Sequence, residues 1–193
     1  MIAIFNSATG AVLEHVVATS GIDMTGKGQK TIPVGYDAST YSWSVAARQY
    51  VEDPAKIEAV LVGQVKAEGE RRSMLVMSTG GAKKTKYAAK AVEVENWYGL
   101  GGVGAATSAL LAAFNLLNTT VRARKFRYAI ADAKAHGDSV DKAIARFVAG
   151  ADASQNEAAR LEGIEQAGVD AIKAATTVAA KRAAHAAINW AAA

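Results

Sequence analysis

The sequence predicts an α+β protein, in which a small N-terminal antiparallel β module precedes an extended, mostly α-helical body. Three observations predict it. Both prolines lie in the first 54 residues, and 37 of the 44 alanines come after Pro54. Residues 1–54 contain many β-branched and turn-forming residues, which favour strands and tight turns. Alanine is the best helix former, and the 139 residues after Pro54 contain no proline to interrupt a helix.

Short apolar or alternating runs, separated by turn residues, predict strands in the first part of the chain. The expected strands lie at residues 2–5, 11–17, 31–35 and 41–45. Gly10 supplies the first turn because glycine accepts positive φ. The strand at residues 31–35 is expected at a sheet edge, since Pro33 has no N–H to donate to a ladder.

Capping residues divide the rest of the chain into helices. Asp53 and Pro54 match the N-cap and the first position of a helix, and Gly137 after His136 matches a helix end. Further breaks are expected at residues 78–81 and 99–104, and Thr176 and Thr177 restart a short last helix. The sequence therefore predicts a docking module at residues 1–53, a helical hairpin at 54–98, a glycine-rich hinge at 99–104, and long helices with a C-terminal helical hairpin at 105–193. Residues 105–135 are expected to form one helix.

The residue types argue against catalysis. The chain contains no cysteine, which excludes disulfides, thiolate metal sites and cysteine nucleophiles. His15, His136 and His185 are far apart and have no partner at metal-ligand spacing. The glycine loop at residues 99–104 lacks the preceding strand and the Gly-Lys-Ser/Thr ending of nucleotide-binding loops. We therefore expect no enzyme activity, no cofactor and no metal.

Charge is distributed unevenly. Residues 55–136 carry thirteen basic and six acidic side chains, whereas the segments on either side are slightly acidic. The densest basic cluster consists of Arg122, Arg124, Lys125 and Arg127. Phe126 and Tyr128 interleave with it, which would allow stacking on nucleic-acid bases. A solvated helix face or contact with an acidic protein surface explains the same charges, and nucleic acid is not the expected partner.

The sequence predicts neither a membrane span nor a secretion signal. The most apolar run, residues 103–117, is shorter than the roughly 20 apolar residues of a membrane helix and contains polar side chains. The first residues lack a basic segment followed by a long apolar stretch.

Apolar and small residues recur at steps of three and four after Gly137, which is typical of a helix that associates along a seam. The expected oligomer interface consists of Val140, Ile144, Phe147, Ala151, Leu161, Ile164, Gly168 and Ile172. Alanine-rich helices with few large side chains usually pack against other helices, so we expect a homo-oligomer. Trp190 either closes the C-terminal turn or anchors a neighbouring subunit or partner.

Three stretches carry a family resemblance. Residues 65–72 contain Glu68, Glu70, Arg71 and Arg72, and residues 78–93 continue with a glycine turn and a basic helix. Residues 171–180 lead to Ile188, Asn189 and Trp190, and the first strands carry Phe5, Asn6, Thr9 and Gly10. Together they resemble small structural, tail-associated proteins of tailed bacteriophages. Gly80 stands where those proteins usually have proline, and residues 99–127 do not belong to the shared pattern.

The resemblance implies a non-enzymatic virion protein, most of all a tail, baseplate or tail-fibre component. It would dock on other phage structural proteins by its β module and self-associate through its helices, with a trimer favoured by tail-fibre symmetry. A capsid decoration or head-fibre protein and a tail-fibre assembly chaperone are the alternatives within this class. A nucleic-acid-binding accessory protein is the alternative from another class.

Overall fold

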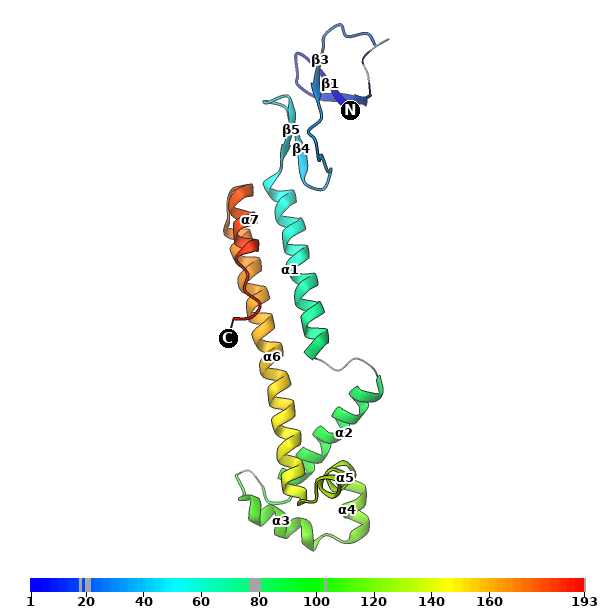
Figure 1. Cartoon of the computed structure of the whole chain (residues 1–193), viewed down its shortest axis with the longest axis vertical. Helices are drawn as coiled ribbons and strands as arrows, with labels where there is room; N and C mark the ends of the chain where they lie inside the picture. Colours follow the sequence, from blue (N-terminus) through cyan, green and yellow to red (C-terminus); the bar gives the residue numbers. More distant parts are fainter. Residues whose placement is uncertain (18, 20–21, 77–80, 103, 193) are drawn as a thin grey trace. The chain divides into compact units, whose positions relative to one another are not determined.

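The computed structural model describes every residue except 18, 20–21, 77–80, 103 and 193. The described residues form five strands followed by seven helices, which confirms the α+β prediction (Figure 1). The strands are β1 Ile2–Asn6, β2 Val12–Val16, β3 Lys27–Thr31, β4 Tyr41–Ser44 and β5 Gln49–Glu52. The helices are α1 Pro54–Val76, α2 Gly81–Tyr98, α3 Thr107–Leu116, α4 Thr119–Lys125, α5 Arg127–His136, α6 Val140–Ala174 and α7 Val178–Ala186.

The strands form two small antiparallel sheets. In the first, β1 lies between β2 and β3, and its Ala3, Ile4 and Phe5 are all buried. The second sheet pairs β4 with β5. Trp43 of β4 connects the two sheets, because its indole Nε1–H donates to the Gly10 carbonyl oxygen at 2.7 Å and its ring packs against Phe5.

One of the strand predictions needs correction. The strand expected at residues 31–35 lies at β3, where Lys27 pairs with Asn6 and Thr31 with Ile2. Gly28 is required in β3, because a Cβ atom there would lie 2.3 Å from the Phe5 ring. Pro33 follows the strand and takes no part in its ladder. The sequence reasoning also missed β5.

The β module leads directly into α1. The Asp53 carboxylate accepts the backbone N–H of Ala55 at 2.9 Å and the Ser42 hydroxyl at 2.6 Å, so the predicted cap is confirmed. These hydrogen bonds, first of all that from Ser42, hold the pKa of Asp53 below its ordinary value.

Helix α1 packs against the C-terminal part of α6. The shared core consists of Ile57, Leu61 and Val65 of α1 with Val169 and Ile172 of α6. Beside it, Lys181 of α7 is only 3% exposed; its ammonium group pairs with Glu58 at 2.7 Å and donates to the Ile172 carbonyl oxygen at 2.9 Å. The predicted last helix is confirmed as α7, which begins where the Thr177 hydroxyl accepts the Ala180 N–H.

The helix expected at residues 105–135 is three helices. The first break follows α3, where the Asn118 side chain caps α4 by accepting the N–H of Val121. The second lies at Phe126, whose φ of −135° and ψ of 36° are not helical. Phe126 is fully buried between Phe114 and Trp97, so tertiary packing places the break. The predicted end of the segment is confirmed, because Gly137 closes α5 with a φ of 66°.

The chain forms two compact units. Unit 1 consists of residues 1–69 and 163–193, and unit 2 of residues 70–162. Both α1 and α6 therefore contribute residues to each unit. The core of unit 2 combines Trp97 of α2, Phe114 of α3, Phe126, and Ile144 and Phe147 of α6. Of the break expected at residues 78–81, residues 78–80 lie outside the described part.

None of the helices among the described residues combines the length and the apolar character that crossing a membrane requires.

Candidate interaction surfaces

Most of the predicted oligomer seam lies inside the chain's own cores. Ile144 and Phe147 are buried in unit 2, and Ile172 is buried in unit 1. Leu161 and Gly168 are also buried, Val140 packs against the unit 2 core, and Ile164 is half-buried. Only Ala151 is exposed. The periodic pattern thus describes the buried side of α6, and self-association of the protein stays a prediction.

The small residues of α6 allow a close approach within unit 1. A Cβ atom at Gly168 would lie 2.6 Å from the Ile188 side chain, so glycine is needed for Ile188 to lie against α6. A shallow hollow of about 280 Å³ lies beside this contact, lined mainly by alanines. Trp190 packs against the same core as Ile188, so the Trp190 side chain has contacts within its own chain. Its role as a partner anchor stays a prediction.

The four predicted basic residues have different environments. The guanidinium of Arg122 is half-buried and lies 5.6 Å from the centroid of the Phe114 ring. Arg124 and Lys125 are exposed on α4, and Arg127 is exposed at the start of α5.

Base stacking by the aromatic residue inside this cluster is ruled out. Phe126 is 0% exposed and belongs to the core of unit 2. Tyr128 is half-buried, and its backbone N–H is bound by Glu93. The interpretation of Phe126 as a base-stacking side chain was therefore wrong, although the exposed cations remain.

Glu93 is a buried carboxylate that sequence reasoning missed. It lies on α2 and is 5% exposed. Its two oxygens accept the backbone N–H groups of Tyr128 and Ala129, each at 2.8 Å. These donors belong to the first turn of α5, whose N–H groups have no partner within the helix. Glu93 thus serves the fold of unit 2, and nothing local in the sequence marks this role.

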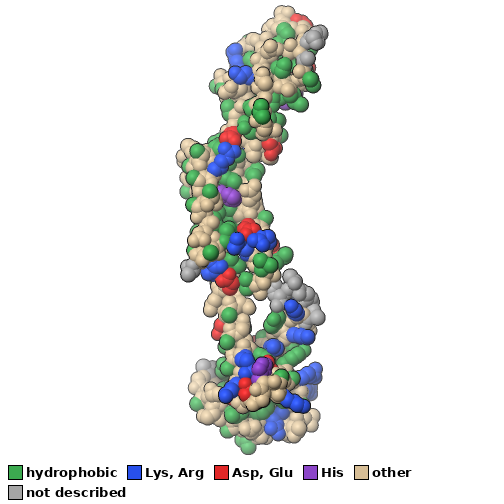
Figure 2. All heavy atoms as spheres, viewed as in Figure 1, with side chains coloured by type: hydrophobic (Ala, Val, Ile, Leu, Met, Phe, Trp, Pro, Cys, Tyr) green, Lys and Arg blue, Asp and Glu red, His purple; other side chains and the backbone are tan. Residues whose placement is uncertain are grey.

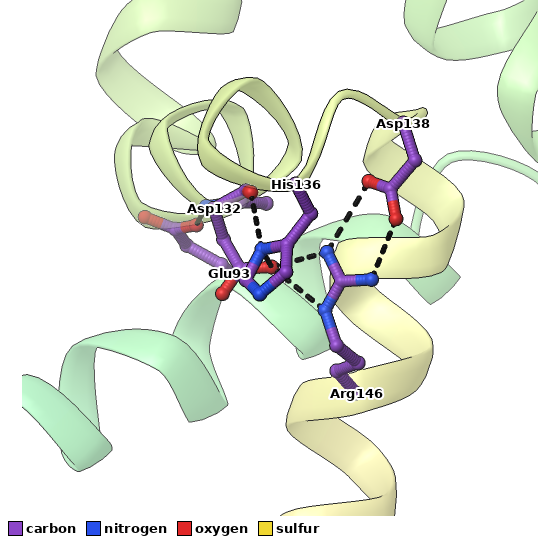
Figure 3. Close-up of polar contacts among 6 residues, drawn as sticks. Glu93, Asp132, His136, Asp138 and Arg146 are labelled. Atoms are coloured by element: carbon purple, nitrogen blue, oxygen red, sulfur yellow. Dashed lines mark hydrogen bonds and ion pairs between the residues drawn. The ribbon is translucent and has the colours of Figure 1, made fainter.

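Arg146 of α6 joins the end of α5 to the start of α6 (Figure 3). Its Nε donates to Asp132 at 2.9 Å and its Nη1 to Asp138 at 2.7 Å. The hydrogen bond from Arg146 is the main cause that lowers the pKa of Asp138 below its ordinary value of 3.8, and the two carboxylates raise the pKa of Arg146. His136 lies beside them and donates from Nδ1 to the Asp132 carbonyl oxygen at 2.8 Å. Arg146 is therefore occupied by contacts within unit 2.

The net positive charge of the protein lies in unit 2. Its fourteen basic and nine acidic side chains give a net charge of +5, whereas unit 1, with eight basic and nine acidic side chains, has −1. Figure 2 shows lysine and arginine side chains gathered on the surface over α2 and α4. We call the exposed cations of these helices and of the start of α5 the basic surface: Lys83, Lys84, Lys86, Arg124, Lys125 and Arg127. Within the described part of the chain, none of these six side chains forms an ion pair with a carboxylate.

A groove of about 810 Å³ lies in unit 2 between α2 and α6. We call it the α2–α6 groove. Val94, Phe147 and Val148 contribute apolar side chains, and Gly150 and Ala151 contribute small ones. The charged residues of the lining are Lys84, Lys90, Glu95, Arg146 and Asp152, and Gln155 is among its polar ones. The ammonium group of Lys90 lies 4.2 Å from the centroid of the Phe147 ring, so it connects the two helices.

The comparisons with known proteins identify no relative of this chain. No protein-family model matches the sequence, and neither a curated protein nor a solved structure is significantly similar to it.

Proposed function

We propose that the protein is a non-enzymatic structural or assembly component of a tailed-bacteriophage particle, in the tail, baseplate or tail fibre. One observation carries the proposal beyond the sequence resemblance. Val65 and Ile172 come from two of the resembling stretches, which are far apart in the chain, and they pack in one core of unit 1. These stretches therefore act as parts of one scaffold.

The segment that departs from the phage pattern lies elsewhere. Residues 99–127 belong entirely to unit 2, together with the excess of positive charge. Unit 2 also contains residues 70–72 and 81–93 of the resembling stretches, so residues 99–127 are the part of this unit that is particular to this chain.

The β module offers a surface for docking on a neighbouring virion protein. Strand β2 is a terminal strand of its sheet, so one edge of its backbone is available to pair with another chain. Val12 and Leu13 of this strand are exposed, as are Val17 and Val34 in the loops of the module. Exposed apolar side chains near an open sheet edge are a common basis for assembly contacts.

The composition of purified particles tests the proposal. Particles of a phage that encodes this chain should contain the polypeptide in stoichiometric amount, and labelling should place it on the tail. Labelling on the head would favour the capsid decoration or head-fibre alternative. Presence in assembly intermediates but absence from finished particles would favour the chaperone alternative. Absence from both would overturn the proposal.

A further inference from the structure

We propose that the α2–α6 groove binds an amphipathic α-helix of a partner protein, with small apolar side chains on one face and acidic side chains along one border of that face. The inference concerns unit 2 alone and holds wherever the protein acts. It rests on three features of the groove: the exposed helix segments on both sides, the small residues between them, and the charge along α2.

Two helix segments beside the groove are exposed to solvent. Residues 83–88 of α2 are all exposed, whereas Glu93 and Trp97 of the same helix are buried. Residues 149–156 of α6 are exposed in the same way, whereas Ile144 and Phe147 are buried. The two helices therefore share a core at one end and diverge at the other, as Figure 1 shows for α2 and the first half of α6. The groove is lined by residues of both helices.

The lining of the groove suits another helix. Ala91 of α2 and Gly150 and Ala151 of α6 have little or no side chain, so a third helix can approach their backbones closely. A Cβ atom at Gly150 would meet nothing within 4 Å, so no packing within the chain requires glycine there. Tyr87, which is 57% exposed, adds a large apolar surface on the α2 side. Recognition of an amphipathic helix by an apolar groove is a common mode of peptide binding.

The charges predict acidic residues on the partner. Lys83, Lys84 and Lys86 are exposed on α2 and make no described ion pair. The first carboxylate of α2 is Glu93, which is already bound to α5. Of the other cations of the lining, Arg146 is held by Asp132 and Asp138, and Lys90 lies over the Phe147 ring. Lys84 lines the groove and Lys83 and Lys86 flank it in the sequence, so carboxylates of a partner would be complementary to this end of α2. Glu95 and Asp152 also line the groove, which confines the complementarity to that end.

A nucleic acid fits these features less well. A duplex would contact the lysines through its phosphates, but it would leave the apolar lining of the groove exposed to water. Base stacking would need accessible aromatic rings, and Phe126 within the basic cluster is buried. The observations therefore favour a helix over a nucleic acid.

A displayed peptide library tests the inference without knowledge of the natural partner. Helical peptides of about 18 residues, or five turns, carry a fixed stripe of alanine and leucine, and the bordering positions vary among Glu, Gln and Lys. The library is selected against the full-length protein at physiological salt. We expect enrichment of Glu along one border of the apolar stripe. Enrichment of Lys, or no selection of any sequence, would overturn the inference.

Four variants of the full chain locate the binding site. Ala151→Trp fills the groove, and its matched control Ala153→Trp alters an exposed alanine of α6 outside the lining. Lys84→Glu reverses a charge in the lining, and its control Lys66→Glu alters an exposed lysine of unit 1. We expect A151W and K84E each to weaken binding of a selected peptide by about tenfold or more, while both controls bind normally. Equal binding by all four variants would place the peptide elsewhere and overturn the inference.

Two parallel measurements test whether a nucleic acid or a second copy of this chain occupies the groove instead. A short DNA duplex that binds more tightly than the acidic peptides, with loss in K84E but not in A151W, would assign the surface to nucleic acid instead. A concentration-dependent dimer that disappears in A151W would assign the groove to a second copy of this chain. Either result would overturn the proposal of a partner helix.

Discussion

The carboxylate of Glu93 binds the backbone of another helix: its Oε2 atom accepts a hydrogen bond from the N–H of Ala129 at 2.8 Å. The other carboxylate oxygen binds the N–H of Tyr128 at the same distance. One side chain of α2 thus satisfies two donors in the first turn of α5, next to the buried ring of Phe126.

Replacement of Glu93 by glutamine should destabilise unit 2. The glutamine side chain has one acceptor oxygen, which can bind only one of the two backbone N–H groups of α5. Its NH2 group faces the other N–H, which is left without an acceptor. Such a buried unsatisfied donor costs about 1–3 kcal/mol of unfolding free energy. Urea denaturation followed by circular dichroism measures the loss. Glu95→Gln, two residues away and exposed, is the control; equal effects of the two substitutions would contradict the role assigned to Glu93.

Acid should weaken the contact between Asp138 and Arg146. The pKa of Asp138 is lower in the folded chain than its ordinary value of 3.8, so the unfolded chain takes up the proton first as the pH falls. The stability from this group is fully present above that value and is lost as the pH falls through the lowered pKa. Asp138→Asn should therefore lower the unfolding free energy at pH 7, and the difference from the native protein should shrink below pH 3.8.

Denaturation curves recorded from pH 7 to strongly acidic pH provide the test. Asp152→Asn, at an exposed carboxylate farther along α6, is the matched control and should show a smaller difference at neutral pH. A D138N difference that stays constant down to the lowest pH would contradict the assignment.

Replacing two glycines of α6 by larger residues should change the stability of the protein in opposite directions. Gly163 is exposed and has open space around it, so Gly163→Ala should stabilise the protein by about 0.5–1 kcal/mol through helix propensity. Gly168 lies against Ile188, so Gly168→Leu should destabilise it by about 1–3 kcal/mol through overpacking. Thermal unfolding distinguishes the two. Similar stabilities of G163A and G168L would show that Ile188 does not lie against α6 in solution.

The ion pair of buried Lys181 and half-buried Glu58 should show strong coupling in a double-mutant cycle. Glu58→Gln leaves the buried Lys181 ammonium group without its carboxylate partner. Lys181→Met leaves the Ile172 carbonyl oxygen, near the end of α6, without its hydrogen-bond donor. The double variant should be less destabilised than the sum of the two single variants, by about 1 kcal/mol or more. The more exposed pair of Arg182 and Glu52 is the control, with an expected coupling of about 0–1 kcal/mol. Equal couplings would contradict the burial of Lys181.

Substitution of Ile172 tests whether its side chain stabilises the chain's own core or also a contact between subunits. Because this side chain is fully buried in unit 1, Ile172→Ala should lower the unfolding free energy by about 2–5 kcal/mol. A loss from the chain's own core gives a decrease in melting temperature that is the same at all protein concentrations. If Ile172 also holds subunits together, the decrease will depend on concentration. Scans over a hundredfold range of concentration distinguish the two.

Local chemistry explains which parts of the fold were predictable. Asp53 caps α1 and Gly137 closes α5, and each acts on backbone groups a few residues away, so the sequence shows both signals. Asn118 carried a similar signal, because asparagine is a favoured cap, and it could have revealed the start of α4. The break at Phe126 has no such sign. It depends on Phe114, Trp97 and the hydrogen bonds from α5 to Glu93, which come from other elements.

The same distinction applies to the candidate surfaces. The spacing of Ile144, Phe147 and Ile172 correctly marked one side of α6 for burial, but spacing cannot tell whether the same chain or another subunit covers it. The basic residues were visible in the sequence, whereas the groove beside them depends on how α2 and α6 pack. Arg124 and Lys125 are exposed, as expected for a solvated helix face, whereas Arg122 is half-buried and lies over the Phe114 ring.

The division into units also bears on how such a chain can evolve. Unit 2 is one uninterrupted stretch, and unit 1 is made of the two stretches on either side of it. Two crossovers, one at each boundary of the codons for residues 70–162, can therefore exchange the whole of unit 2 and leave the sequence of unit 1 intact. Chains with the same N- and C-terminal segments but unrelated central segments are the expected products of that exchange.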